Sequence, residues 1–222
     1  MTIGDPTTFA IESSITRAYA RLSFRALGYF VIHIAGCRYG VHTSDATMLA
    51  CSLDAVDARI SRRGTHTAPF ATELSGRIAD ALHIAIYAPE EPDKKTFGMS
   101  QVELSDFTYA RHLIWAPDGD EAFDDGSSVL QFDVGDRVRL IGFRSGVGYH
   151  HDPATLRDVW LDAAGYYATL KEWRDAFIAE WQNAPKISEE EDQKEPNKPD
   201  AANPAIASQL QAGCHGRGVA DP

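Results

Sequence analysis

The sequence is poor in cysteine and contains no long apolar run. Its three cysteines, Cys37, Cys51 and Cys214, are odd in number and show no CxxC spacing, which argues against a disulfide framework or a zinc knuckle. No stretch of 18 or more apolar residues is present, so no membrane-spanning segment is predicted. The N-terminus has no basic stretch leading into an apolar one, as a secretory signal would. We therefore expect a cytoplasmic protein with reduced thiols.

Basic residues are also in short supply. The chain has 21 Lys and Arg against 32 Asp and Glu, a net charge of −11. Residues 185–222 hold seven of the acids and four of the bases, so residues 1–184 still carry 25 acids and 17 bases. A nucleic-acid-binding protein needs clustered cations to displace counterions from phosphates, which this balance opposes. The acidity is compatible with solubility alone, or with attraction of a basic protein partner.

Enzyme and nucleotide-binding signatures are missing. There is no GxSxG elbow, no GxxxxGK[ST] phosphate loop and no GxGxxG after a strand. The best metal-like cluster is His150-His151-Asp152, but adjacent histidines of an extended segment point to different sides, and no HxxxH helix supplies further ligands. Cys37 and Cys51 are expected to be buried small residues. We predict no catalytic residue, no metal site and no cofactor.

Apolar periodicity predicts groups of strands separated by helices. Strands are expected over residues 7–13, 28–34, 37–41, 107–115, 128–134, 137–143 and 158–161, and helices over 45–62, 69–87 and 164–182. Ala35-Gly36 and Gly135-Asp136 are expected to form hairpin turns. The expected fold class is α+β, a mostly antiparallel twisted sheet with three main helices packed on it.

The helix ends and faces are also predicted. Residues 43–45 (Thr-Ser-Asp) offer capping oxygens to the first helix, and Pro69 is expected in the first turn of the second. The only dense basic spot, Arg59, Arg62 and Arg63, suits the negative end of the first helix dipole. The third helix has an aromatic face formed by Tyr166, Leu170, Trp173, Phe177 and Trp181.

Two segments lie outside the apolar periodicity. Residues 185–222 combine charge runs, proline and glycine, so we expect one domain over 1–184 followed by a disordered tail. The loop over 117–126 is rich in carboxylates, but Ala122 and Phe123 fall where later EF-hand ligands belong, so calcium binding is not the first interpretation. Solvation or contact with a cationic partner explains the loop better. The candidate partner-binding residues are Asp118, Asp120, Glu121, Asp124 and Asp125.

The beginning of the chain resembles a family of polymorphic-toxin immunity proteins, the one numbered 42. Ile3-Gly4-Asp5-Pro6 leads into Phe9-Ala10-Ile11-Glu12, and a second strand with Gly28-Tyr29-Phe30 and Ile32 precedes the hairpin glycine Gly36 and Tyr39-Gly40. The resemblance is closest over residues 1–41 and does not extend into the last 40. It implies a cytoplasmic, non-catalytic protein that binds the C-terminal domain of a cognate toxin and occludes it. Because each member matches its own toxin, the resemblance carries over no binding residues.

Two other functions remain open on the sequence. One is a generic adaptor or regulatory module, and the other is an enzyme or small-ligand binder with a pocket near His150-His151-Asp152. Bound metal would favour the second, whereas a toxin gene next to this one would favour the immunity protein. A nuclease-type toxin is expected to be cationic, and the acidic surface would attract it. Neither nucleic acid nor membrane is expected as a partner.

Overall fold

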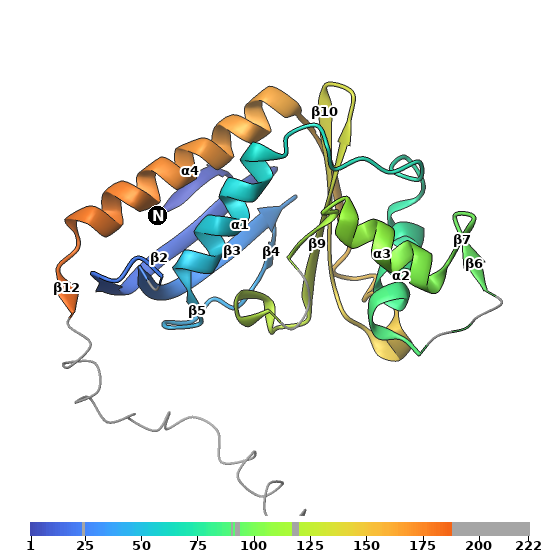
Figure 1. Ribbon diagram of the computed structural model, residues 1–222, viewed down its shortest axis with the longest axis horizontal. Helices are drawn as coiled ribbons and strands as arrows, with labels where there is room; N and C mark the ends of the chain where they lie inside the picture. Colours follow the sequence, from blue (N-terminus) through green and yellow to red (C-terminus); the bar gives the residue numbers. More distant parts are fainter. Residues whose placement is uncertain (24, 90, 92–93, 117–119, 188–222) are drawn as a thin grey trace, which may run out of the picture. The chain divides into compact units, whose positions relative to one another are not determined.

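The computed structural model describes residues 1–187 except 24, 90, 92–93 and 117–119. Its elements form two sheets, a small hairpin and four α-helices in the described part of the chain (Figure 1). The first sheet contains β1 (Thr2–Asp5), β2 (Phe9–Tyr19), β3 (Ala26–Ile34), β4 (Cys37–Tyr39), β5 (Thr47–Met48) and β12 (Lys186–Ile187). The second contains β8 (Ile114–Ala116), β9 (Ser127–Val134), β10 (Arg137–Arg144) and β11 (Arg157–Asp162). Only β12 pairs in parallel, with β2, so the predicted α+β class and the mostly antiparallel pairing are confirmed.

One face of the first sheet is covered by α1 (Leu49–Ser61) and α4 (Ala163–Asn183), as Figure 1 shows. The aromatic face predicted for the last helix packs here. Trp173 is fully buried, stacks on Phe177 with 5.4 Å between ring centroids and meets the edge of Phe30. Its indole N–H donates to the Ser13 hydroxyl at 3.0 Å. Helix α4 is therefore held to the first sheet by packing of its aromatic side chains and by the buried hydrogen bond from Trp173 to Ser13.

The second sheet has apolar residues on both faces, because β9 and β10 are buried almost throughout. Val129, Val138 and Leu140 belong to the core shared with the first sheet. The opposite face packs against α2 (Ser75–Tyr87) and α3 (Gln101–Ala110) through Leu130, Phe132, Ile141 and Phe143. The hairpin turn predicted at Gly135-Asp136 is confirmed, with Val134 facing Arg137 across it.

Tyr39 joins the two sheets. Its ring is fully buried, and its hydroxyl lies 2.6 Å from the Thr155 carbonyl and 3.1 Å from the Gly142 carbonyl. A Cβ on Gly142 would lie 2.5 Å from the Tyr39 ring, so only glycine lets the ring approach β10 this closely. The predicted hairpin that carries Tyr39, β3–β4 with Ala35-Gly36 at its turn, is confirmed.

The strand predicted over 107–115 was wrong: residues 107–110 are the end of helix α3, 111–112 form a turn, and only the last two residues belong to strand β8. The helix begins with a capping box, in which the Ser100 hydroxyl accepts from the Glu103 N–H and the Glu103 carboxylate accepts from the Ser100 N–H. This reciprocal cap outweighs the strand preference of the aromatic residues that follow. The hairpin β6 (Lys95–Thr96) and β7 (Met99–Ser100) leads directly into it.

Two predicted helix starts were also wrong. Helix α1 begins at Leu49 with Met48 as its N-cap and no side-chain cap, because β5 ends at Met48 and leaves no room for residues 43–45 to cap it. Helix α2 begins at Ser75, six residues beyond Pro69. Phe70 lies before the helix and stacks on Phe97 at 4.4 Å instead of joining the helical stripe.

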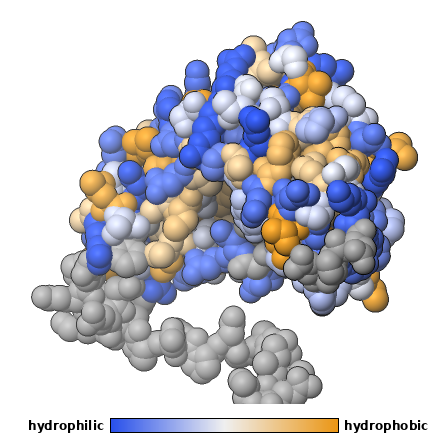
Figure 2. Space-filling model, turned by 45° about the vertical axis from the view of Figure 1, so that its right-hand side comes forward, coloured by the Kyte–Doolittle hydropathy of each residue, from blue (hydrophilic) through white to orange (hydrophobic). Residues whose placement is uncertain are grey.

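The space-filling view in Figure 2 shows a mixed surface, with hydrophobic residues gathered between hydrophilic ones over the part built from α2 and α3. Exposed large apolar side chains there include Leu74, Val102 and Tyr109. The expected tail over 185–222 falls mostly outside the described residues; its first part, Lys186–Ile187, pairs with β2 as β12.

Candidate binding surface

The acidic loop is held to the core by its two apolar residues. Ala122 and Phe123 lie in the short 3₁₀ helix η1 (Glu121–Phe123) and are buried. The Asp120 carboxylate caps η1 by accepting from the Ala122 N–H at 3.0 Å, and the Ala122 carbonyl accepts from the Val41 N–H at 2.8 Å. The residues that made an EF-hand implausible are therefore the anchors that fix the loop.

The predicted partner-binding residues do not all have the same surroundings. Asp120, Glu121 and Asp124 are exposed. Asp125 is half-buried, lies 3.3 Å from the Arg144 guanidinium and accepts from the Ser127 N–H at 3.1 Å. Its charge is already paired within the fold. Asp118 lies outside the described residues.

Helix α1 adds a carboxylate to this loop, which the sequence reasoning missed. Partial burial raises the pKa of the Cys51 thiol, and so do the negative charges of Asp120, Asp54 and Glu121, which lie near enough to act on it. Cys51 and Asp54 are both exposed, so the prediction that Cys51 is buried was wrong. We define the acidic surface as Asp54, Asp120, Glu121 and Asp124. No ion pair is recorded for these four within the described part of the chain.

The two adjacent histidines, His150 and His151, both contact the carboxylate of Asp80. The Nδ1 atoms of His151 and His150 lie 2.6 Å and 3.2 Å from the Asp80 carboxylate on α2. The Asp80 carboxylate also accepts from the His151 N–H at 2.9 Å, and the Asp152 carboxylate caps a turn by accepting from the Ala154 N–H. No group of three or more metal-ligating side chains is found among the described residues. The arrangement ties the loop after β10 to α2.

The arginines predicted to face the end of the first helix dipole lie in two different environments: Arg59 is buried and Arg62 is exposed. Arg59 is buried, and its guanidinium donates to the carbonyls of His112, at 2.5 Å, and Ile114. Arg62 is exposed and contacts the His112 ring at 3.0 Å. A pocket of about 180 Å³ lies between α1 and the segment leading into β8. We define the cationic pocket by its polar lining, Arg59, Arg62, His66, His112 and Trp115.

Comparison with known proteins identifies the family. The family described as "Immunity protein 42" matches residues 1–176. The chain belongs to this family. It is therefore an immunity protein, which binds and neutralises a cognate bacterial toxin. The resemblance predicted from the first strands is confirmed, and the matched residues include both the acidic surface and the cationic pocket.

One solved structure is similar to this immunity protein, the crystal structure of CdiI from Burkholderia dolosa AUO158. It shares 16% sequence identity with a TM-score of 0.48, and the match covers 79% of this chain and 99% of that one. No curated protein matches this immunity protein in sequence. No helix in its described part is both long enough and apolar enough to cross a membrane.

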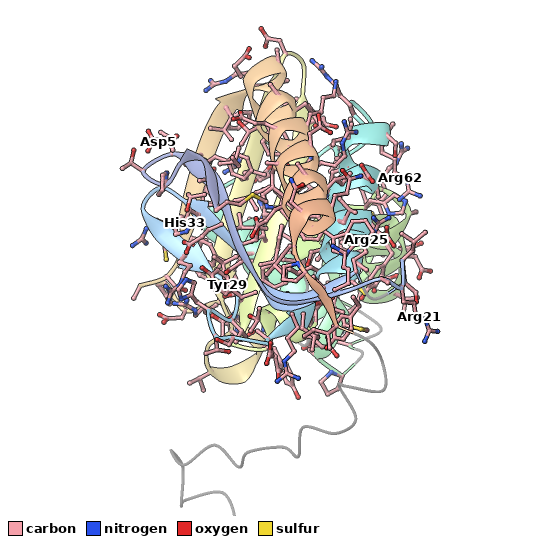
Figure 3. All side chains as sticks on the ribbon, turned by 90° about the vertical axis from the view of Figure 1, so that its left-hand side faces the viewer. Asp5, Arg21, Arg25, Tyr29, His33 and Arg62 are labelled. Atoms are coloured by element: carbon pink, nitrogen blue, oxygen red, sulfur yellow. The ribbon has the colours of Figure 1, made fainter. Side chains whose placement is uncertain are left out.

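The immunity protein carries a polar cluster on the face of the first sheet opposite α1. Figure 3 shows Tyr29 and His33 on that side and Arg62 on the side of α1. Glu12 on β2 lies 2.8 Å from His33 Nε2 and 2.9 Å from His42 Nε2, and it accepts from the Tyr29 hydroxyl at 3.1 Å. Partial burial alone would raise the pKa of Glu12, but the hydrogen bonds from His42, His33 and Tyr29 outweigh it and lower the pKa to about 2.

Proposed function

We propose that this immunity protein neutralises a cationic, nuclease-type toxin domain by covering its active site or substrate-binding surface with the acidic surface. Binding would take place in the cytoplasm and would require no catalysis by the immunity protein itself. The observation that carries the proposal is the grouping of exposed carboxylates on two separate elements, the 120–124 loop and α1, around one exposed thiol.

Three features support this surface over an arbitrary acidic stretch. The loop is anchored by buried Ala122 and Phe123, so little conformational entropy is lost on binding. The carboxylates face solvent without a recorded cationic partner among the described residues, whereas Asp125 is committed to Arg144. A toxin that binds nucleic acid presents cations where its substrate binds, and such charges steer association and complement carboxylates. The partner-binding set is thereby revised: Asp54 joins it and Asp125 leaves it.

The test compares two triple variants of equal charge. Asp120→Asn, Glu121→Gln and Asp124→Asn neutralise the loop; Asp106→Asn, Asp136→Asn and Glu172→Gln neutralise exposed carboxylates elsewhere. Binding to the toxin domain encoded beside this gene is measured at several salt concentrations. The loop variant should associate at least about tenfold more slowly, with a weaker salt dependence, because local charge steers encounter. Equal losses in both variants would show that only net charge matters.

The Cys51 thiol supplies an independent footprint. Because it lies among the carboxylates of the acidic surface, a bound toxin should protect it from alkylation. Cys37, on the β3–β4 hairpin, is the internal comparison and should react at the same rate with and without toxin. Peptide mass spectrometry measures both rates in one sample. Unchanged alkylation of Cys51 in a saturated complex would place the toxin elsewhere.

A further inference from the structure

The cationic pocket contains a buried positive charge that forms no ion pair among the described residues. Burial lowers the pKa of Arg59 by more than the Asp133 carboxylate raises it from a distance. Arg59 is 5% exposed, and burial lowers its pKa to about 10, so it is still charged at neutral pH. Its recorded hydrogen-bonding partners are two backbone carbonyls and the His66 ring. Among the described residues no carboxylate lies within 4.0 Å of it. A buried guanidinium without a counter-charge is costly, and the cost falls when an anion binds beside it.

Arg139, the other buried arginine among the described residues, gives a comparison for Arg59. Arg139 is 4% exposed, as deeply buried as Arg59. It forms a bidentate pair with Asp158, at 2.9 Å and 2.6 Å, and also donates to the carbonyls of Ala71 and Glu73. Carbonyl contacts are therefore common to the two arginines, and the carboxylate is what Arg59 lacks. A purely structural role, holding α1 to the 112–114 segment, explains the carbonyl contacts but leaves the guanidinium without an ion-pair partner.

Two further polar atoms of the pocket lining are unsatisfied. The indole nitrogen of Trp115 and Nε2 of His66 are buried and have no hydrogen-bond partner within the described part of the chain. An indole N–H can only donate, so Trp115 requires an acceptor. At the rim, Arg62 is exposed and places a second guanidinium over the same space. The 180 Å³ pocket is large enough for a small ion together with water.

We infer that the cationic pocket binds an oxyanion, a phosphate or carboxylate group, between Arg59, Arg62 and the Trp115 indole. Guanidinium groups bind such oxygens in a bidentate manner, and the indole N–H supplies one more donor. The inference concerns residues outside the acidic surface and does not depend on how the toxin binds.

Indole NMR signals of the full-length, ¹⁵N-labelled protein test the inference, with inorganic phosphate as the probe. Sodium chloride at matched ionic strength is the control. Phosphate should shift the Trp115 indole signal, assigned with Trp115→Phe, along a saturable curve. The Trp173 signal should remain in place, since its N–H is already bound to Ser13. A linear shift, or an equal shift with chloride, would overturn the inference.

A rim variant separates binding from folding. Arg62→Gln changes an exposed residue and should raise the apparent Kd for phosphate about fivefold, the size expected for losing one exposed charged contact. Arg63→Gln is the matched control, because Arg63 stacks over Tyr167 outside the pocket lining. Equal Kd values for Arg62→Gln and wild type would contradict the assignment. A parallel titration with acetate distinguishes a carboxylate site from a phosphate site, since the better ligand saturates at lower concentration.

Discussion

The Glu12 cluster gives the sharpest pH prediction. Glu12 is held by two histidines and a tyrosine on the face of the first sheet opposite α1, and its pKa is lowered from 4.5 to about 2. A shift of that size corresponds to at most roughly 3 kcal/mol. Because the side chain is 22% exposed to water, which screens the interaction, we expect Glu12→Gln to lower the free energy of unfolding by about 1–2 kcal/mol at pH 6.

The sign of the pH dependence follows from linkage. A carboxylate with a depressed pKa in the folded state stabilises the protein fully above its unfolded pKa, here about 4.5, and loses that contribution as pH falls toward about 2. The difference between wild type and Glu12→Gln should therefore stay nearly constant between pH 6 and pH 5 and shrink from about pH 5 to pH 3.

Urea denaturation at pH 6, 5, 4 and 3 measures this difference, and Glu172→Gln on α4 is the control. Glu172 is exposed, so its substitution should change stability by less than about 0.5 kcal/mol at every pH. A constant difference for Glu12→Gln between pH 6 and pH 3 would refute the reasoning, since it would show that the ionised carboxylate is not what His33 and His42 stabilise.

Three further predictions concern the fold. Tyr39→Phe should cost about 1–3 kcal/mol in urea denaturation, because it removes the hydroxyl that contacts the Gly142 carbonyl in a buried position and the Thr155 carbonyl in a partly buried one. Removing the hydroxyl of Tyr109, which is 54% exposed, should cost under about 0.5 kcal/mol. Ser100→Ala should cost about 1 kcal/mol by removing half of the α3 capping box, visible as faster amide exchange in the first turn. Phe30→Ala should cost about 3–5 kcal/mol, since Phe30 is 1% exposed against Trp173, and a loss below 1 kcal/mol would contradict the packing.

The sequence predicts elements well where neighbours in the chain decide them. The α4 face follows from apolar residues spaced by three and four, and Trp173 and Phe177 are buried as that spacing requires. The β9–β10 hairpin follows from two apolar runs around Gly135-Asp136. Helix α3 differs from the strand that its aromatic residues predict, because the Ser100–Glu103 capping box fixes a helix start just before them.

The candidate sites depend on contacts that no local pattern specifies. Arg59 resembles an ordinary helix-end arginine, but its carbonyl partners lie 53 and 55 residues further along the chain. Asp54 and Asp120 likewise lie 66 residues apart in the sequence (120 − 54). The carboxylate run alone gave three of the four residues of the acidic surface, and only the fold could separate them from Asp125, which Arg144 neutralises.

Helix α1 carries charges of both signs that the two proposals use. Asp54 lies on α1 and Arg62 is its C-cap, eight residues further on. Over eight residues a regular α-helix advances about 12 Å along its axis and turns about 80° beyond two full turns. A partner that lies along α1 therefore contacts the acidic surface near Asp54 and the cationic pocket near Arg62 at the same time. Purely attractive charge gives speed of association but little orientation, whereas alternating sign penalises a reversed or shifted partner. Under the proposed function, mixed charge at α1 and its C-cap would penalise basic domains other than the cognate toxin.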